Sequence, residues 1–273
     1  MTSEFITFSS QYDHVAKLCE EGSGTVWLVR KISDNSLHTA KIIPAEKCER
    51  KTWCEETQEF YPDEIFLTQT LEHAGLQVVE EIYYVDSWWI VVTEFQPCFK
   101  ILSQHVAQTR LLSEEKIRDA ILQILDVVDY LADFGIDHRD INADNILYSP
   151  STNQIKLVNF EQASVMPKSR YFTFQGTPEL CPPEFLTYGS YSSVTGTTWT
   201  IGCLAHTLLN GLSPILDSRS RRTEECKVLP FRNSKRSQLA DDFLQSLLVV
   251  NDDCRKLPNQ IYLHPWMISS AMD

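Results

Sequence analysis

The sequence has few features of a membrane-spanning, secreted or metal-binding protein. Its longest strongly apolar run, Trp88 to Val92, is far too short to cross a bilayer. Residues 1–5 lack the basic and apolar regions of a signal peptide. The eight cysteines stand singly, without a C-x-x-C pair or any metal-ligand spacing. These absences predict reduced thiols and a location in the cytoplasm or the nucleus.

Basic residues are also in short supply, with 24 Lys and Arg against 37 Asp and Glu. The resulting formal net charge of -13 argues against nucleic acid and against an anionic membrane surface as partners. The chain contains no internal repeat and no low-complexity tract. We therefore expect a monomer of 273 residues with a large core, whose partners are other proteins.

The most informative stretch of the chain is residues 138–145, which read His-Arg-Asp-Ile-Asn-Ala-Asp-Asn. This stretch fits H-R-D-x-x-x-x-N, a pattern in which an aspartate accepts the proton of an incoming hydroxyl. The asparagine five residues later holds a magnesium ion on the nucleotide phosphates. Asp140 and Asn145 are therefore candidate catalytic residues, and Asn145 is also a candidate metal ligand.

Other residues at the expected distances make the chain resemble the protein kinases over residues 12–267, and among them the PIM group of Ser/Thr kinases. The resemblance implies that Lys41, in Thr39-Ala40-Lys41, holds the α- and β-phosphates and that Glu64 pairs with it. Both residues are therefore candidate catalytic residues. ATP and Mg²⁺ are the implied cofactors. The implied nucleotide contacts are Gly24, Val26, Ala40, Lys41, Thr93, Glu94 and Leu147.

The second half of the chain carries features that favour the PIM group. Gly176-Thr177, followed by Cys181-Pro182-Pro183-Glu184, resembles the G-T-x-x-x-x-P-P-E segment of that group. His264-Pro265-Trp266-Met267 resembles the closing motif of the family. Thr197 stands where most kinases have an aspartate in a long helix, and the PIM group also lacks this aspartate. The resemblance further implies a buried ion pair between Glu184 and Arg255.

The glycine-rich loop of the family is degenerate in this chain. Counting back from Val26 places its three glycines at Cys19, Glu21 and Gly24, and only the last is a glycine. Glu21 puts a carboxylate where backbone amides approach phosphate, which is repulsive, and a Cβ restricts that approach. We therefore predict that this loop binds phosphate weakly. Without the resemblance, Gly22-Ser23-Gly24 is typical of an ordinary hairpin turn.

Two further departures affect the groups that would handle metal and phosphate. Residues 157–161 stand where kinases have D-F-G, so the second candidate metal ligand, Asn159, offers a neutral carbonyl to a cation that prefers carboxylate oxygen. Glu161 adds a carboxylate in place of a glycine. Asn142 replaces the lysine that would steady the γ-phosphate.

The resemblance and the hydrophobic pattern together predict an α+β, two-lobed fold in one kinase domain, residues 12–267. Residues 1–11 would form a polar tail, residues 12–96 a β-rich N-lobe with the hinge, and residues 97–273 a helical C-lobe. Strands are expected within 12–43 and at 81–85 and 88–93, and helices at 63–73, 113–135, 193–210, 237–249 and 259–263.

Two functions remain open from the sequence. The first is a pseudokinase, or a very slow ATP-dependent phosphotransferase, that acts in signalling through protein partners and holds ATP and Mg²⁺ weakly. The second is an active Ser/Thr protein kinase, because Asp140, Asn145 and the pair Lys41–Glu64 are all present. A small-molecule phosphotransferase is disfavoured, since such enzymes lack the G-T segment with P-P-E and the closing His-Pro-Trp. The number of disabled positions favours the first function.

Overall fold

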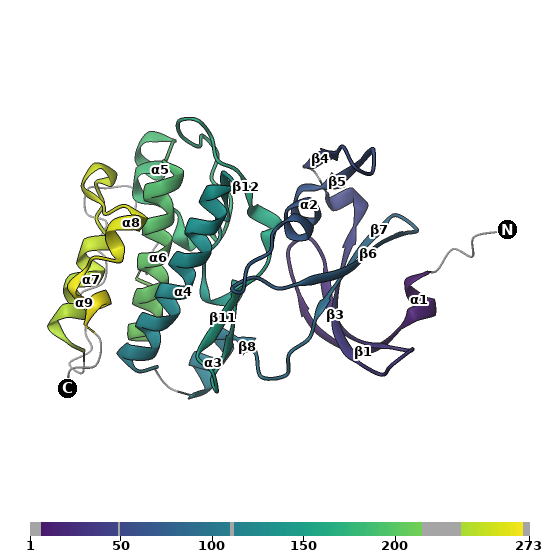
Figure 1. The fold of residues 1–273 in the computed structure, drawn as a ribbon. Coiled ribbons are helices and arrows are strands. Elements are labelled where there is room, and N and C mark those ends of the chain that lie inside the picture. Colours follow the sequence, from purple (N-terminus) through teal and green to yellow (C-terminus); the bar gives the residue numbers. More distant parts are fainter. Residues whose placement is uncertain (1–6, 49, 110–111, 215–235, 270–273) are drawn as a thin grey trace. The chain divides into compact units, whose positions relative to one another are not determined.

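The computed structural model describes residues 7–48, 50–109, 112–214 and 236–269. The chain divides into two compact units (Figure 1). The N-terminal unit comprises Met1–Pro97 and Asn159–Glu161, and the C-terminal unit comprises Cys98–Val158 and Gln162–Asp273. The first is built on a β-sheet and the second on helices, which confirms the predicted α+β class.

The N-terminal unit is centred on a five-stranded sheet in the order β1-β2-β3-β7-β6, with every neighbouring pair antiparallel. The strands are β1 (Tyr12–Glu20), β2 (Thr25–Lys31), β3 (Leu37–Pro44), β6 (Val79–Val85) and β7 (Trp88–Glu94). These strands confirm the expected ones, with bounds that differ by a few residues.

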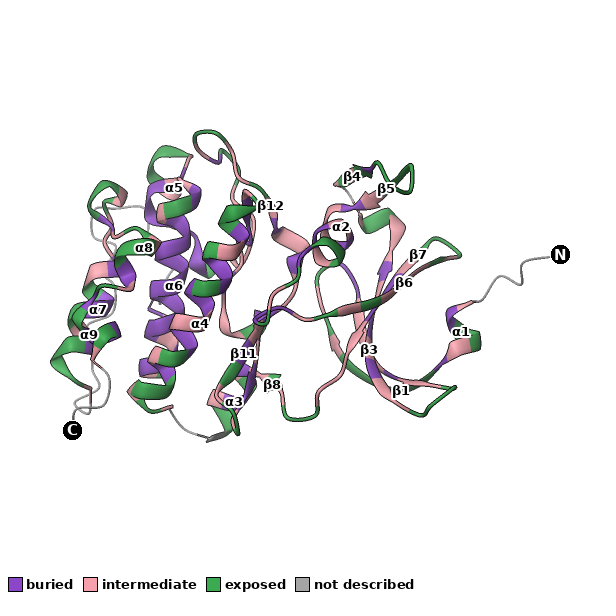
Figure 2. Ribbon diagram, viewed as in Figure 1, coloured by how far each residue is buried: buried purple, intermediate pink, exposed green. Residues whose placement is uncertain are grey.

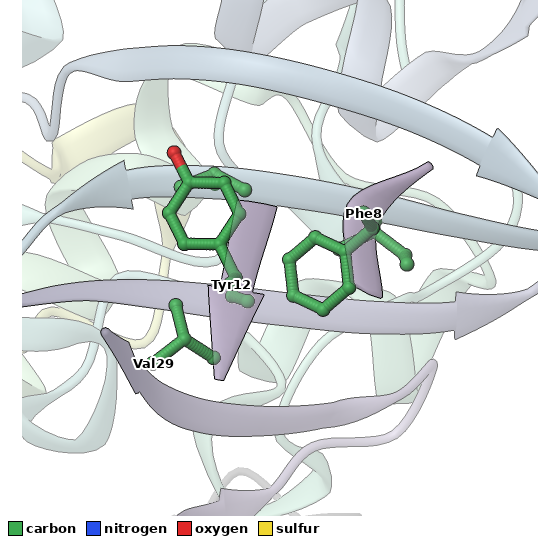
Figure 3. Packing of buried hydrophobic residues seen from close by; sticks show 6 residues of the cluster. Phe8, Tyr12 and Val29 are labelled. Atoms are coloured by element: carbon green, nitrogen blue, oxygen red, sulfur yellow. The ribbon is translucent and has the colours of Figure 1, made fainter. Parts of the chain in front are cut away.

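A hydrophobic cluster covers one face of this sheet (Figure 3). Its buried members are Phe8, Tyr12, Val29, Ala40, Ile90 and Val92. Phe8 opens a short helix, α1 (Phe8–Gln11), and its ring stacks on Tyr12 with centroids 5.2 Å apart. Only 5% of Phe8 is exposed, so the packed unit includes residues that the sequence analysis assigns to a polar tail.

Residues 45–70 differ most from the expectation for this unit. The charged stretch before the helix forms a 3-10 turn, η1 (Ala45–Lys47), and a hairpin of β4 (Lys51–Cys54) and β5 (Glu59–Pro62). Pro62 then precedes helix α2 (Asp63–Thr70), which ends three residues before the predicted end. The next residue, Leu71, is extended and buried, so the chain has left the helix there.

The C-terminal unit is built around two long helices, α4 (Glu114–Asp133) and α6 (Ser193–Asn210), as predicted. The Ser113 hydroxyl accepts from the Lys116 amide at the start of α4, and Gly135 follows its end with φ 66°. Figure 2 shows α6 as a largely buried helix, in agreement with fourteen buried residues among its eighteen. A helix that is buried nearly all round lies at the centre of its unit, and here the buried set includes polar residues such as Thr198 and His206.

The other elements of this unit are shorter. Its helices are α3 (Leu102–Thr109), α5 (Pro183–Tyr188), α7 (Gln238–Leu247), α8 (Pro258–Ile261) and α9 (Pro265–Ile268). Its strands are β8 (Lys100–Ile101), β9 (Ile136–Asp137), β10 (Ile146–Ser149), β11 (Gln154–Leu157) and β12 (Ser164–Val165). The 3-10 turns are η2 (Ala143–Asn145), η3 (Phe160–Gln162), η4 (Pro178–Leu180) and η6 (Asp252–Cys254).

The predicted helix at 237–249 corresponds to α7, which is shorter at both ends, and that at 259–263 corresponds to α8, which begins one residue earlier and ends two residues earlier. Helices α3, α5 and α9 were not predicted. None of the helices in the described ranges has the length and the hydropathy to span a bilayer.

Candidate active site

Lys41 and Glu64 form an ion pair inside the N-terminal unit. Lys41 lies on β3 and Glu64 in the first turn of α2, and each side chain is 13% exposed. Burial opposes the charge on Lys41, but the carboxylates of Glu64 and Glu21 outweigh it and raise the pKa of the lysine. Burial raises the pKa of Glu64, opposed by Lys41 and aided by Glu21 and Glu161. The two raised pKa values share one cause, since several carboxylates lie close to the Lys41 ammonium.

Glu21 and Asn159 also contact the Lys41 ammonium. A Glu21 carboxylate oxygen lies 2.7 Å from Lys41 Nζ, and the Asn159 side-chain oxygen accepts from the same nitrogen at 3.2 Å. The sequence analysis anticipated Glu21 only as a repulsive group in the loop. Here the carboxylate instead pairs with the lysine that would hold phosphate. Asn159 has a φ of 67°, a left-handed conformation in which asparagine is enriched.

Glu161 binds the loop between β1 and β2. Its carboxylate accepts from the Ser23 amide at 2.9 Å, and the Ser23 hydroxyl donates to Glu64 at 3.3 Å. A Cβ added to Gly22 would lie 2.8 Å from a Glu161 oxygen, so the carboxylate packs directly on that glycine. Arg50 donates to the backbone carbonyl of Glu161 at 2.8 Å. The loop therefore already holds an anionic group of the same chain.

Gly24 has a packing role that differs from the predicted contact with nucleotide. A Cβ at this position would lie 2.3 Å from the carbonyl oxygen of Ile42 on β3. Close approach of two backbones therefore requires glycine here. Val26, two residues on, pairs directly with Lys41 across β2 and β3, so both side chains lie on the same face of the sheet.

The predicted contact of Ala40 with the nucleotide is wrong, because Ala40 lies on the opposite face of the sheet from Lys41. Successive side chains of a strand point to opposite faces, and Ala40 is fully buried in the cluster that contains Phe8. Thr39 shares the face of Lys41 instead. Its hydroxyl is hydrogen-bonded to that of Thr93, its partner on β7.

Glu94, at the end of β7, belongs to the predicted hinge. Its backbone carbonyl accepts from the Gln77 side chain at 3.0 Å, and its carboxylate accepts from the Gln96 side chain at 2.7 Å. The carboxylate of this residue is thus directed to a neighbouring amide, and the backbone oxygen already has one donor.

Asp140 lies at the centre of a hydrogen-bond network in the C-terminal unit. One carboxylate oxygen accepts from the Thr177 amide at 2.8 Å, the Thr177 hydroxyl at 2.7 Å and the Asn142 side chain at 3.0 Å. The other accepts from the Asn145 side chain at 2.8 Å. Asn142 thus contacts the carboxylate directly, and side-chain hydrogen bonds connect the loop from Asp140 to Asn145 with Thr177.

Leu147 follows this loop on β10 and is partly exposed. Gly176 lies against the loop with φ 109°, and a Cβ there would lie 2.5 Å from the Arg139 carbonyl oxygen. The Gly-Thr pair singled out from the sequence therefore serves the loop directly: the glycine allows the approach and Thr177 binds Asp140.

The Glu184–Arg255 pair implied by the resemblance is confirmed. Two guanidinium nitrogens of Arg255 each donate to one Glu184 oxygen at 2.8 Å, and the side chains are 0% and 1% exposed. This bidentate geometry fixes the end of the segment that begins near Asn159 to the body of the C-terminal unit.

Comparison with known proteins decides the family. A model of the protein kinase domain matches residues 12–267. The chain belongs to the protein kinase family.

Relatives of this kinase-family chain include members of the PIM group. Serine/threonine-protein kinase pim-2 of Danio rerio is 28% identical over 97% of this chain and 87% of that protein. Serine/threonine-protein kinase prk-2 of Caenorhabditis elegans is 28% identical over 96% of this chain and 59% of that protein. Serine/threonine-protein kinase 17A of Oryctolagus cuniculus is 29% identical over 71% of this chain and 51% of that protein. The resemblance to PIM-like Ser/Thr kinases is confirmed.

Asp137 is a residue of this kinase site that the sequence analysis missed. Only 5% exposed, it accepts from the Arg139 amide at 3.1 Å, from Ser193 at 2.6 Å and from Thr197 at 3.4 Å. Thr197 is the position where most kinases carry an aspartate. The carboxylate is thus supplied from the strand before the catalytic loop and reaches the hydroxyl of Thr197. An acid directly before H-R-D, beside an apolar residue, was the available signal.

The described residues fit a magnesium–triphosphate poorly. The Lys41 ammonium is bound to two carboxylates, the Ser23 amide is bound to a third, and the Asn159 oxygen accepts from Lys41. Within the described ranges, no group of three or more His, Cys, Asp or Glu side chains is placed to hold a metal ion. Asn145 also directs its side-chain amide to Asp140.

Proposed function

We propose that this kinase-fold protein is a PIM-like pseudokinase, or a very slow ATP-dependent phosphotransferase, that acts in signalling by binding protein partners. The observation that carries the proposal is the contact of Asn159 with Lys41. At the position where kinases bind metal through a carboxylate, this chain has a neutral amide whose oxygen is hydrogen-bonded to the lysine. We place the protein in the cytoplasm or the nucleus, as a monomer that binds neither membrane nor nucleic acid.

The expected loss of rate follows from how kinases work. Phosphoryl transfer depends almost entirely on positioning and electrostatic stabilisation, so each lost charged contact acts on the rate directly. If each is worth about 3 kcal/mol, each lowers the rate about a hundredfold. Asn159 and Asn142 replace two charged groups of the family. Together they lower the rate about ten-thousandfold if the two effects are independent.

The alternative is an active Ser/Thr protein kinase that transfers the γ-phosphate of ATP to protein Ser/Thr. The support for it is the hydrogen-bond network around Asp140 in the C-terminal unit. Asp140 is held by Thr177, Asn142 and Asn145 in a defined orientation, as a group that accepts a substrate proton must be. The same network also stabilises the loop, which is why it does not decide between the two functions.

Two measurements on the purified protein distinguish the functions. The first is the thermal shift with ATP, with and without Mg²⁺, and the second is phosphate incorporation into protein substrates. The proposal predicts a small shift that is independent of Mg²⁺, and incorporation that is absent or only slightly above an Asp140→Asn control. Robust metal-dependent incorporation that Asp140→Asn abolishes would establish the alternative.

A repair experiment tests the assigned cause. Asn159→Asp with Glu161→Gly returns the carboxylate and the glycine of the family, so we expect measurable phosphate incorporation to appear. A matched control is Asn35→Asp, which adds the same carboxylate at another asparagine with positive φ, exposed in the turn between β2 and β3. Equal rates for the repaired protein and for this control would show that the defect lies elsewhere.

A further inference from the structure

The loop between β1 and β2 and the residues after β11 bring three carboxylates around one lysine in the N-terminal unit. We propose that Glu21 and Glu161 stand in for nucleotide phosphates, so that this site takes an uncharged nucleoside in preference to a nucleoside triphosphate. The inference rests on the proposed function, because it assigns a ligand class to the same site.

The first step of the argument is the partner of Lys41. A phosphate oxygen would have to approach the ammonium, but a Glu21 oxygen already lies 2.7 Å from it and Glu64 pairs with it from α2. The Glu21 side chain is 22% exposed, so the pair is largely shielded from water and from salt. Asn159 accepts the third ammonium proton at 3.2 Å, so a phosphate gains the lysine only by displacing a carboxylate of the same charge sign or this amide oxygen beside both carboxylates.

The second step is the backbone of the loop. Main-chain amides of such loops bind phosphate because they point positive dipoles at it. Here the Ser23 amide donates to Glu161 at 2.9 Å, and the Glu161 oxygens fill the space above Gly22. Arg50 holds the Glu161 backbone at 2.8 Å, which keeps the carboxylate near the loop. One carboxylate thus replaces a phosphate at the amide, and the other replaces a phosphate at the lysine.

The third step is the charge of the cluster. Glu21, Glu64 and Glu161 bring three carboxylates together, and Lys41 is in contact with two of them. The cations of Arg50 and Lys47 donate to the backbone carbonyls of Glu161 and Gly22. The repulsion among the carboxylates is evident at Glu64, whose pKa is raised by burial and further by Glu21 and Glu161. A triphosphate would add several more negative charges, whereas an uncharged nucleoside adds none.

The groups on the nucleoside side of the site carry no such obstacle. Val26 and Thr93 are uncharged, and the Glu94 carboxylate accepts from Gln96. A base can bind through apolar contacts and backbone groups, as small-molecule sites generally do. The preference for nucleoside over triphosphate is therefore set at the phosphate end.

The test compares adenosine and ATP by isothermal titration calorimetry in the presence of EDTA, so that neither turnover nor metal contributes. The wild-type protein should bind adenosine at least as tightly as ATP. Glu21→Gln with Glu161→Gln keeps the side-chain shapes and removes two charges. We expect this variant to bind ATP at least a hundredfold more tightly than wild type, about tenfold for each carboxylate, while the adenosine affinity changes little.

A control variant removes the same number of charges from the same unit. Glu56→Gln with Asp86→Asn neutralises two exposed carboxylates that lie outside the cluster, and its ATP affinity should equal that of wild type. Thermal unfolding without ligand identifies a variant that fails to fold, and the single variants Glu21→Gln and Glu161→Gln then replace the double one.

The outcomes separate this inference from the proposed function. An ATP affinity that stays unchanged in the neutralised variants, or that exceeds the adenosine affinity in wild type, would overturn the inference. A gain in ATP affinity together with measurable adenosine binding by wild type would support it, and a wild-type protein that binds no adenosine would overturn it. The proposed function depends instead on phosphate incorporation, which the binding experiment does not measure.

Discussion

The substitution Glu184→Gln gives the sharpest test of the stabilising interactions in the C-terminal unit. The glutamine keeps the size of the side chain but loses the charge that the Arg255 guanidinium binds through two hydrogen bonds of 2.8 Å. Arg255 would keep the backbone carbonyls of Val249, Val250 and Thr195, which carry no counter-charge. Because the Arg255 side chain is 0% exposed, its cation would stay buried without a counter-charge.

The expected magnitude follows from this burial. Removing one partner of a buried ion pair destabilises a protein by about 3–5 kcal/mol. For a unit of this size, that corresponds to a fall in Tm of roughly 6–20 °C. Urea unfolding followed by tryptophan fluorescence is a suitable assay, since Arg255 lies 5.0 Å from the ring of Trp199.

Two control variants test whether the loss comes from the buried cation. Glu20→Gln breaks the exposed pair of Glu20 with Lys17, and we expect no measurable change in stability. The double variant Glu184→Gln with Arg255→Met removes the uncompensated cation and should lose less than the sum of the two single losses. A loss below about 1 kcal/mol for Glu184→Gln, or strict additivity in the double variant, would refute the reasoning.

Two further predictions concern a glycine and a histidine. Gly24→Ala should destabilise the N-terminal unit by about 1–3 kcal/mol in urea unfolding, because the new Cβ meets the Ile42 carbonyl oxygen at 2.3 Å; an unchanged midpoint would contradict the close approach. Burial lowers the pKa of His206 from 6.5 to about 4, although the Leu212 carbonyl favours the protonated ring. Because the folded pKa lies below the unfolded value, the neutral ring of His206 contributes to the free energy of unfolding above pH 6.5. This contribution is lost as pH falls toward 4, by up to about 3 kcal/mol. His206→Gln should lack this part of the pH dependence, and identical pH profiles for the two proteins would disprove the assignment.

The long helices of the C-terminal unit could be predicted because their signals are local. Helix α4 has apolar residues at helical spacing between a serine cap and a glycine, and the structure contains both boundary contacts. Helix α6 was predicted with its observed bounds. The hairpin β4–β5 was missed, since its residues are mostly polar and its strands are four residues long.

The error at Ala40 came from applying a motif without its geometry. Adjacent residues of a strand point to opposite faces, so Ala40 and Lys41 could not both face the nucleotide. The period-two rule alone, applied to the sequence, selects Thr39 for the face of Lys41.

The contacts of Glu21, Glu161 and Asp137 could not be predicted locally. Glu161 is 138 residues from Ser23 along the chain, and Asp137 is 60 residues from Thr197. Such partners are set by the fold of each unit, whereas the sequence shows only that a charge occurs at an unusual position. Sequence reasoning therefore identified Glu21 and Glu161 as anomalies but not what they bind.

The most direct test of the proposed function is the initial rate of γ-phosphate transfer or release from ATP by purified wild-type protein with Mg²⁺. Asp140→Asn supplies the background, and Asn159→Asp with Glu161→Gly supplies the repaired comparison. We predict that the wild-type rate lies about ten-thousandfold below the usual kinase range, or at the background, and that the repaired protein exceeds it. A wild-type rate in the usual kinase range of roughly 1–100 s⁻¹, lost in Asp140→Asn, would contradict the proposal.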